Sequence, residues 1–425
     1  MTFGSRLRYL RLDRGLTQRE LAEPRFSAAF VSTIETDKRH PSRRAVEHFA
    51  GKLGVEAEEL VTGIPRGEQA RLRARLFDAR AAVGRGELDA ARVALEAIAA
   101  TATEHGWTAE EADVLVTRGL ISEQLAEFAD GLELFDRAQD LLRRESPLRE
   151  VDAVVGRARC HQLLGDVHYS IHILETHHRV LREAELEDPS SLARLHSSLV
   201  AAYFDAGLMR QAHESARIAL DLAPASSDPD RVANMHINVA RVLLHQGRFD
   251  EARRSFDKAE ELYRDLDWRN DLGRVHLARG FGLLAERRPG DAKSHLDVAR
   301  GIFIQTGSVL NEVRSALQLA CAHRMLDEAD RALDILASID MARRAGVSEQ
   351  GIAWREQGLC HVAQGRTSDG VDCLRTALGL FENAQDVNES AYTYRLLGDL
   401  MRDQDELATA CEAYRSAALA LEHVA

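Results

Sequence analysis

The N-terminal end of this 425-residue chain carries an excess of positive charge that could bind a polyanion. Residues 1–44 contain ten Arg or Lys and five Asp or Glu, a net of +5. The whole chain has a formal net charge of −13, so the remaining residues hold a net of −18. A basic end on an acidic chain is expected where that end meets a polyanion and the rest stays off it. Nucleic-acid binding is therefore the first hypothesis, against a basic face that is merely solvated.

Metal chemistry is the second possibility, because several histidines lie close together in the sequence. His168 and His172 are four residues apart, with His161, His177 and His178 nearby. No glutamate follows as in H-E-x-x-H, and no cysteine or carboxylate set completes a zinc site. We interpret them as surface histidines of a long helix, and expect neither a metal nor a cofactor.

Other reactive residue types give no catalytic pattern. Gly280-x-Gly282 lies in the middle of an expected helix, where small residues serve packing rather than phosphate binding. No Ser-His-Asp or Cys-His order stands out, so we predict that the protein is not an enzyme. The N-terminus lacks a signal peptide and no segment has the ~20 apolar residues of a membrane span, which indicates a cytoplasmic protein. Its five cysteines lack C-x-x-C spacing and are interpreted as reduced, buried thiols: Cys160, Cys321, Cys360, Cys373 and Cys411.

The basic end must be positioned by short helices. An apolar content of 45%, with 5% aromatic residues and eight prolines, favours an ordered all-α fold. Helix start signals occur at Thr17, which forms a capping box with Glu20, at Ser27 and at Ser42, while Gly15 ends the first helix. We therefore expect five helices within about 60 residues, a helix-turn-helix arrangement. They are predicted at residues 3–13, 17–22, 28–35, 43–53 and 54–60.

Residues 3–62 resemble the phage-repressor (Xre) type of helix-turn-helix. The resemblance rests on Gly15-Leu16-Thr17-Gln18-x-x-Leu21-Ala22 and on Val31-Ser32-x-Ile34-Glu35-x-x-Lys38-Arg39-x-Pro41-Ser42. The family usually has one more residue before the third helix, where this chain has Glu23-Pro24-Arg25-Phe26, so its turn is shortened. The resemblance implies a five-helix, lambda-repressor-like domain at residues 1–62, with a linker at residues 63–67.

The resemblance also implies which residues meet DNA. The third helix would enter the major groove, with its side chains facing base edges and the flanking cations clamping phosphates. Its outward residues are poor in the Arg, Asn and Gln that make bidentate base contacts, so selectivity would depend also on Arg25, DNA shape or dimer spacing. The predicted DNA-binding residues are Ala28, Ala29, Ser32 and Thr33 at base edges, Gln18 on a phosphate, Lys38, Arg39, Arg43 and Arg44 on the backbone, and in addition Arg25 and Ser27.

Residues 68–425 repeat a small residue at a nearly constant interval. The spacings are 40, 39, 42, 40, 40, 40, 38 and 40 residues, and a bulky residue usually follows four positions later, with an exception at Ala216. A small residue lets two helices approach closely, and stacked hairpins bury the apolar faces that no hairpin buries alone. We predict an α-solenoid of about nine hairpins that resemble tetratricopeptide repeats more than HEAT or armadillo repeats. The small residues are Ala91, Gly131, Ser170, Ala212, Ala252, Ala292, Ala332, Gly370 and Ala410.

Such an array has a concave inner surface formed by the first helix of each hairpin. Eighteen residues before each small position lies a residue that we expect to be the second of that helix and to face the channel. Four consecutive copies there are polar or basic, which predicts a cradle for a peptide or small anionic ligand. The alternative is that these positions are polar helix starts paired with acidic neighbours. The predicted ligand-binding residues are Arg194, Asn234, Arg274 and Arg314, with Asn238 and Arg241 one or two turns on.

The combination of these two domains is similar to that of the peptide-sensing regulators of Gram-positive bacteria. They imply a homodimer on a two-fold DNA site, with a ligand in the solenoid that controls a transcriptional regulator. The alternative is a protein-binding module, an antitoxin or anti-activator, that uses DNA binding for autoregulation. The expected partners are double-stranded DNA and a peptide, small anionic ligand or protein, without a membrane.

Overall fold

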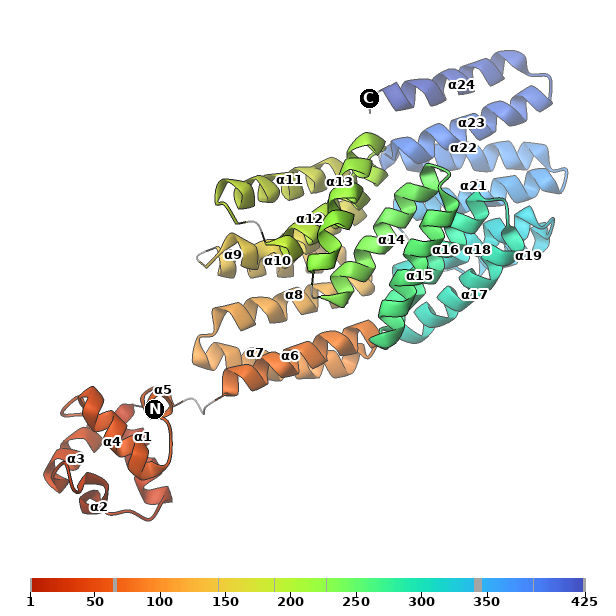
Figure 1. Cartoon of the computed structure of the whole chain (residues 1–425). Helices are drawn as coiled ribbons and strands as arrows, with labels where there is room; N and C mark the ends of the chain where they lie inside the picture. The colour runs from red at the N-terminus through yellow and green to blue at the C-terminus, as the bar shows by residue number, and fades with distance from the viewer. Residues whose placement is uncertain are drawn as a thin grey trace. The chain divides into compact units, whose positions relative to one another are not determined.

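The computed structural model describes residues 2–63, 67–143, 145–186, 188–226, 228–339, 346–384 and 386–422. Within these ranges the chain is helical and forms no strand, which confirms the all-α fold (Figure 1). The chain divides into two compact units, residues 1–75 with 104–106, and residues 76–103 with 107–425. Residues 64–66 of the predicted linker lie outside the described ranges, so the linker stays a prediction.

The first unit begins with five short helices whose starts follow from their capping side chains. Thr17 and Glu20 form the expected reciprocal capping box, and the hydroxyls of Ser27 and Ser42 accept from the amides of Phe30 and Ala45. The fifth helix begins later than predicted, because Gly54 takes a left-handed conformation that ends the fourth helix. The helices are α1 (Phe3–Asp13), α2 (Gln18–Ala22), α3 (Ala28–Glu35), α4 (Arg43–Leu53) and α5 (Ala57–Thr62).

These five helices surround one apolar core. Leu7 of α1, Val31 of α3 and Phe49 of α4 are fully buried together. Gly4 lets the start of α1 pack against the end of α3, since a Cβ atom there would overlap the carbonyl oxygen of Ile34. The other buried apolar residues of this core are Leu21, Ala22, Ile34, Ala45, Val46, Ala50, Leu53 and Leu60.

From α6 onward the described residues form nine helical hairpins, as the repeat predicted. Each hairpin pairs a first helix with a second helix, and a short 3-10 turn at Ala223–Ala225 follows the fourth hairpin. The first helices are α6 (Glu68–Arg85), α8 (Thr108–Gln124), α10 (Pro147–Leu163), α12 (Pro189–Asp205), α14 (Pro229–His245), α16 (Arg269–Ala285), α18 (Val309–Met325), α21 (Val347–Ala363) and α23 (Val387–Asp403). The second helices are α7 (Leu88–His105), α9 (Phe128–Leu142), α11 (Val167–Glu183), α13 (Met209–Leu222), α15 (Phe249–Asp265), α17 (Pro289–Thr306), α19 (Ala329–Ala337), α22 (Thr367–Asn383) and α24 (Leu407–Glu422).

The nine small residues all occupy the same place in this architecture. Each is the fourth residue of a second helix and each is buried. At Gly370, for example, an added Cβ would lie 2.9 Å from the carbonyl oxygen of Gly358 in the paired first helix. The predicted role of the small residue, close approach of the two helices of a hairpin, is therefore confirmed.

The bulky residue four positions later fills the space between neighbouring first helices. Phe135 of α9 is fully buried, and its ring lies where side chains at Gly119 of α8 and Gly156 of α10 would otherwise stand. Gly280 and Gly282 are packing residues too, since Cβ atoms there would meet Leu296 and Leu244. One aromatic ring thus joins two successive hairpins.

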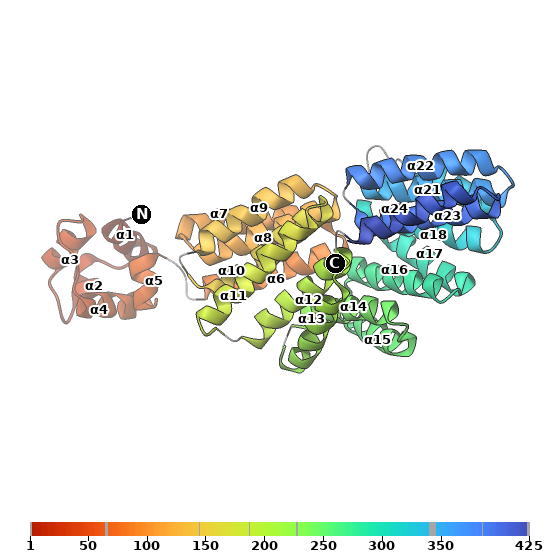
Figure 2. The ribbon, with the colours of Figure 1, turned by 90° about the horizontal axis from the view of Figure 1, so that it is seen from above.

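The array coils until hairpins about five places apart touch. A Cβ atom at Gly84 in the first hairpin would lie 2.7 Å from the ring of Trp268, just before the sixth. The side-chain amide of Gln124 donates to the carbonyl of Thr306 at 3.1 Å, and that of Asn388 to the carbonyl of Asp205 at 3.0 Å. Figures 1 and 2 show the start of the array meeting its middle.

Three positional predictions are corrected by the structure. The residue eighteen places before each small residue is the sixth of its first helix, not the second, because these helices begin four residues earlier than expected. His177 is buried rather than exposed, and its Nε2 lies 2.9 Å from the carbonyl oxygen of Pro147. Cys411 is exposed, while Cys160, Cys360 and Cys373 are buried as predicted.

Candidate DNA-binding and ligand-binding sites

The predicted recognition helix α3 is fixed by one buried ion pair. Arg11 of α1 binds Glu35, the last residue of α3, through two hydrogen bonds of 2.6 and 3.0 Å. Only 9% of the Arg11 side chain and 2% of the Glu35 side chain are exposed. Gln18 of α2 also donates its amide to Glu35, at 2.8 Å. A single carboxylate therefore holds the first three helices in register.

Gln18 consequently has a structural role that the sequence reasoning did not assign. Its phosphate contact stays a prediction, because the same amide nitrogen is bonded to Glu35 in this structure. The role of Glu35 was missed as well, although its place within the repressor-like motif was a usable signal.

The shortened turn between α2 and α3 is stabilised by aromatic packing. Phe26 lies 5.1 Å from Phe30 and 5.6 Å from Phe49, measured between ring centroids. His48 approaches the carbonyl oxygens of Leu21 and Ala22 at the end of α2, at 3.2 and 3.0 Å. Aromatic packing thus holds the turn in place, although the turn is one residue shorter than in the family pattern.

The outward side of α3 offers methyl groups more than polar ones. Ala29 is exposed, and Ala28, Ser32 and Thr33 are partly exposed. The hydroxyl of Thr33 donates to the carbonyl of Phe30 at 2.8 Å, which leaves its methyl group as the available contact. Methyl groups suit thymine, so the predicted base contacts of this face would be apolar, and they stay a prediction.

The predicted phosphate clamps surround this helix as exposed cations. Arg25, Lys38 and Arg44 have no ion pair among the described residues, and all three are exposed. Arg39 lies over the ring of Phe30, with 5.1 Å between its guanidinium carbon and the ring centroid. Arg43 pairs with Glu47 at 3.0 Å, an exposed contact that phosphate is able to replace. Ser27, exposed at the start of α3, accepts from the amide of Phe30.

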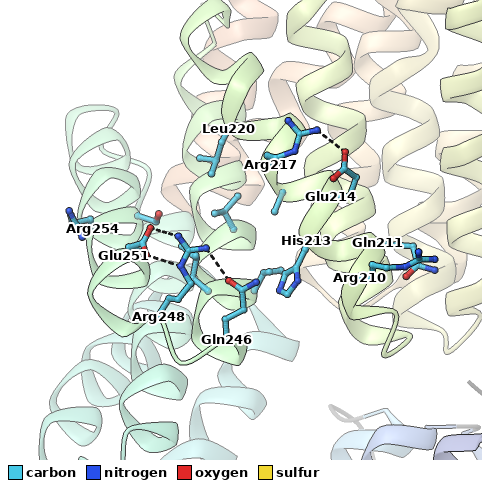
Figure 3. A pocket seen from close by; sticks show the side chains of 15 residues that line it. Arg210, Gln211, His213, Glu214, Arg217, Leu220, Gln246, Arg248, Glu251 and Arg254 are labelled. Atoms are coloured by element: carbon cyan, nitrogen blue, oxygen red, sulfur yellow. Dashed lines mark hydrogen bonds and ion pairs between the residues drawn. The ribbon is translucent and has the colours of Figure 1, made fainter. Parts of the chain in front are cut away.

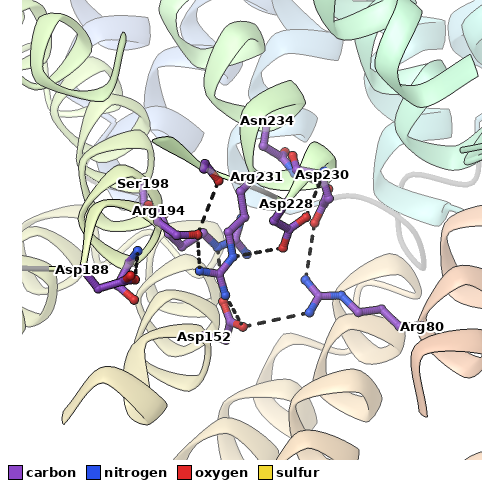
Figure 4. Close-up of polar contacts among 12 residues, drawn as sticks. Arg80, Asp152, Asp188, Arg194, Ser198, Asp228, Asp230, Arg231 and Asn234 are labelled. Carbon is purple, nitrogen blue, oxygen red and sulfur yellow. Dashed lines mark hydrogen bonds and ion pairs between the residues drawn. The ribbon is translucent and has the colours of Figure 1, made fainter. Parts of the chain in front are cut away.

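Inside the solenoid, first helices from several hairpins meet in a charged cluster (Figure 4). Asp152 of α10 accepts a hydrogen bond of 3.0 Å from Arg231 of α14. Arg194 of α12 and Arg80 of α6 lie 3.6 and 4.0 Å from the same carboxylate. Burial would raise the pKa of Asp152, but the three arginine charges outweigh burial and lower it to about 2. The carboxylate is thus kept ionised at the centre of the coil.

A second interior carboxylate lies near arginines of the predicted ligand-binding series Arg194, Asn234, Arg274 and Arg314, called here the inner ladder. Burial raises the pKa of Glu123, while the charges of Arg159, Arg194 and Arg274 oppose that shift. Arg159 binds one oxygen of Glu123 at 3.0 Å. The other oxygen, Oε1, is buried and has no hydrogen-bond partner among the described residues, and the same holds for Nε of Arg194. The coil therefore gathers two of the predicted ligand-binding residues around Glu123 and leaves its Oε1 without a hydrogen bond among the described residues.

All six predicted ligand-binding residues also have partners within the chain. Five of the six contact acidic side chains, as the alternative reading expects, and Asn238 bonds to Ser197, so ligand binding by them stays a prediction. The pairs are Arg194 with Asp152 at 3.6 Å, Asn234 with Asp230 at 2.8 Å, Asn238 with the Ser197 carbonyl at 3.0 Å, Arg241 with Asp205 at 2.8 Å, Arg274 with Asp271 at 2.8 Å and Arg314 with Glu349 at 2.8 Å.

Two other kinds of site were searched for in the described residues. No group of three or more His, Cys, Asp or Glu residues there is arranged to hold a metal ion. None of the described helices is both long and apolar enough to span a bilayer.

Fold and site together define a helix-turn-helix unit followed by an α-solenoid. Residues 2–62 match the model of a family described as a helix-turn-helix domain, so the chain carries such a domain at its N-terminus. The immunity repressor protein of Bacillus phage phi105 is 39% identical over 62 residues, which are 14% of this chain and 43% of that protein. The chain thus spans less than half of the curated relative that it matches.

Solved structures with the same fold cover most of the chain. A Rap protein complexed with competence and sporulation factor is 13% identical with a TM-score of 0.64, over 84% of this chain and 99% of that chain. The apo form of the quorum sensor NprR from B. thuringiensis is 14% identical with a TM-score of 0.54, over 83% and 99% of the two chains. At such low identity these likenesses show the helical-repeat fold alone.

Proposed function

We propose that this protein is a DNA-binding transcriptional regulator whose activity is controlled by a peptide bound inside the solenoid. The observation that carries the proposal is α3, a helix locked by the Arg11–Glu35 pair and surrounded by the unpaired cations Arg25, Lys38 and Arg44. Cations placed around a groove-sized helix are what phosphate contacts require. A homodimer on a two-fold site is part of the same proposal.

The interior charges favour a peptide over a small anion as the ligand. The ladder arginines already have carboxylate partners, so an anion alone would compete with Asp152 and Glu349. A peptide brings amide donors and acceptors as well as charge, and its amide groups suit Oε1 of Glu123, which has no hydrogen-bond partner among the described residues. The quorum sensor NprR and the Rap protein share the fold in which we place this ligand.

Salt-dependent binding to the gene's own promoter region tests the DNA-binding half. Each phosphate contact contributes about 0.9 to the slope of log affinity against log salt concentration, so Lys38→Ala and Arg44→Ala should each lower that slope by about 1. Arg92→Ala, an exposed arginine on α7, is the matched control. Fluorescence anisotropy of labelled duplexes measures these slopes, and wild-type binding that does not change with salt would refute the proposal.

The ligand half is tested separately on the protein–DNA complex. Synthetic peptides encoded beside the gene are titrated into the complex, and a change in anisotropy reports control of DNA binding. Arg194→Gln should weaken the response to the active peptide at least tenfold and leave ligand-free DNA binding unchanged. A stoichiometric protein partner together with indifference to peptides would instead support the protein-binding module.

A further inference from the structure

The outer side of the solenoid carries a groove that lies on second helices rather than on the inner ladder. It lies between α13 and α15, and α14 forms its floor (Figure 3). Its volume is about 920 Å³, within the range of about 300–1,000 Å³ of small-molecule pockets. The floor and near wall are apolar and consist of Ala216, Leu220, Val239, Val242 and Leu243.

The groove coincides with the one exception to the repeat pattern noted in the sequence. Four residues after the small residue, other hairpins place a bulky side chain, as at Leu95, Phe135 and Leu296, which are fully buried. In the fourth hairpin that position is Ala216, which instead lines the groove. A leucine at this position would add bulk to the wall of the groove.

The polar lining is asymmetric in charge. Four arginines and two glutamates border the groove. Arg248 is held by Glu251 through bonds of 2.7 and 2.6 Å, and it also donates to Gln246 at 3.3 Å (Figure 3). On the opposite wall, Arg217 donates to Glu214 at 2.7 Å. The excess of arginine favours an anionic group in the groove.

His213 is the histidine that borders the groove. Its Nε2 atom is buried and has no hydrogen-bond partner among the described residues, although the ring borders the groove. Buried polar atoms are normally hydrogen-bonded, and one that is not requires an explanation.

We propose that this groove binds an amphiphilic organic anion. The apolar body of the ligand lies on Ala216, Val239 and Val242, and its acidic group lies beside Arg210 and Arg254, which border the groove and have no ion pair among the described residues. This site is separate from the inner ladder, so its ligand is distinct from the peptide of the proposed function. Both halves of the ligand are needed, because the groove offers apolar contact and cationic donors side by side.

The test uses 8-anilinonaphthalene-1-sulfonate, which joins an aromatic body to one anionic group. Its fluorescence is titrated against full-length wild-type protein and Ala216→Leu, which restores the side chain common at this position. The matched control is Ala97→Leu, which adds the same bulk at an exposed site on α7. We expect one saturable site per chain, at least tenfold weaker binding in Ala216→Leu, and unchanged binding in Ala97→Leu.

Two further variants separate a loss of the site from a loss of folding. Leu220→Glu places a carboxylate on a wall residue that is 38% exposed, and Arg254→Gln removes an exposed arginine that has no ion pair among the described residues. Both should keep the helical circular dichroism of the wild type and weaken binding of the probe at least fivefold. Unchanged affinity in both variants, or in a folded Ala216→Leu, would overturn the proposal.

Discussion

The buried carboxylate of Glu35 contributes more to the stability of the helix-turn-helix unit than the exposed ion pairs on its surface. Glu35 accepts hydrogen bonds from Arg11 and Gln18, whereas Arg43 and Glu47 form an exposed pair four residues apart. Exposed pairs contribute about 0–1 kcal/mol. Removing one partner of a buried pair costs about 3–5 kcal/mol, because the other charge is left uncompensated. The position of α3 therefore depends on Glu35 more than on any surface cation.

Replacement of Glu35 by alanine should loosen α3 before it affects the solenoid. We expect Glu35→Ala to destabilise the helix-turn-helix unit by about 3–5 kcal/mol, since Arg11 then lies buried without its partner. Hydrogen–deuterium exchange of the α3 amides measures this effect, and Glu47→Ala is the control at an exposed pair. Equal exchange in the two variants would show that the buried pair does not hold the helix.

A second residue-scale effect concerns pH. Burial lowers the pKa of His196 to about 4, against about 6.5 in an unfolded chain. Below pH 6.5, His196 is protonated in the unfolded chain but stays neutral in the folded chain. Its contribution to the free energy of unfolding is therefore complete above pH 6.5 and is lost as the pH falls towards 4. Burial raises the pKa of Asp113 to about 6. The contribution of Asp113 to the free energy of unfolding has the opposite pH dependence and is lost as the pH rises through 6.

The histidine contribution is isolated by substitution. His196→Leu removes the titration, so the drop in unfolding free energy between pH 7.5 and pH 5 should shrink by about 2 kcal/mol. Urea unfolding at the two pH values measures the drop, and His168→Leu, at an exposed histidine, should leave it as in the wild type. A drop in His196→Leu as large as the wild type's would exclude this histidine as its source.

At the scale of helices, local signals and periodic packing were predictable, and helix starts without caps were not. Thr17, Ser27 and Ser42 mark their helices because a side-chain oxygen binds an amide three residues away. By contrast, α8 and α16 follow Trp107 and Trp268, which make no side-chain cap. The position eighteen residues before each small residue was expected to be the second of its helix, although Asp188 and Asp228 cap α12 and α14 and make it the sixth.

The bulky residue of each hairpin carries much of the energy between neighbouring hairpins. Phe135 is fully buried against two glycines, and Phe→Ala changes in such cores cost about 3–5 kcal/mol. We expect Phe135→Ala to destabilise the solenoid by that amount in urea unfolding. Phe281→Ala, at a ring 48% exposed on α16, should cost far less. A similar cost for both would mean that the ring does not join hairpins.

At the scale of the molecule, the decisive contacts join residues that no local pattern connects. Arg231 and Asp152 are 79 residues apart, and Arg80 and Asp230 are 150 apart. The basic ladder was visible in the sequence, but its carboxylate partners depend on how the hairpins coil. The period of about 40 residues gave the number of hairpins, and it left open the degree of twist between them.

The coil contact at Gly84 can be broken without touching the interior charges. A leucine there would overlap the ring of Trp268, so the first hairpin must move, at a cost of about 1–3 kcal/mol. Gly84→Leu should speed hydrogen exchange around residues 80–86 and enlarge the radius of gyration in X-ray scattering. Gly301→Leu is the control, since its Cβ would meet open space. No change in either measurement would argue against a closed coil.

The contacts between hairpins about five places apart also restrict how this chain is able to evolve. In an open array, a whole repeat is gained or lost with only two neighbours affected. Here, deletion of one middle hairpin would shift Gln124 away from Thr306 and bring the wrong surfaces together. The contacts across the coil therefore fix the number of hairpins. We expect insertions in related chains to lie within loops rather than to add whole hairpins.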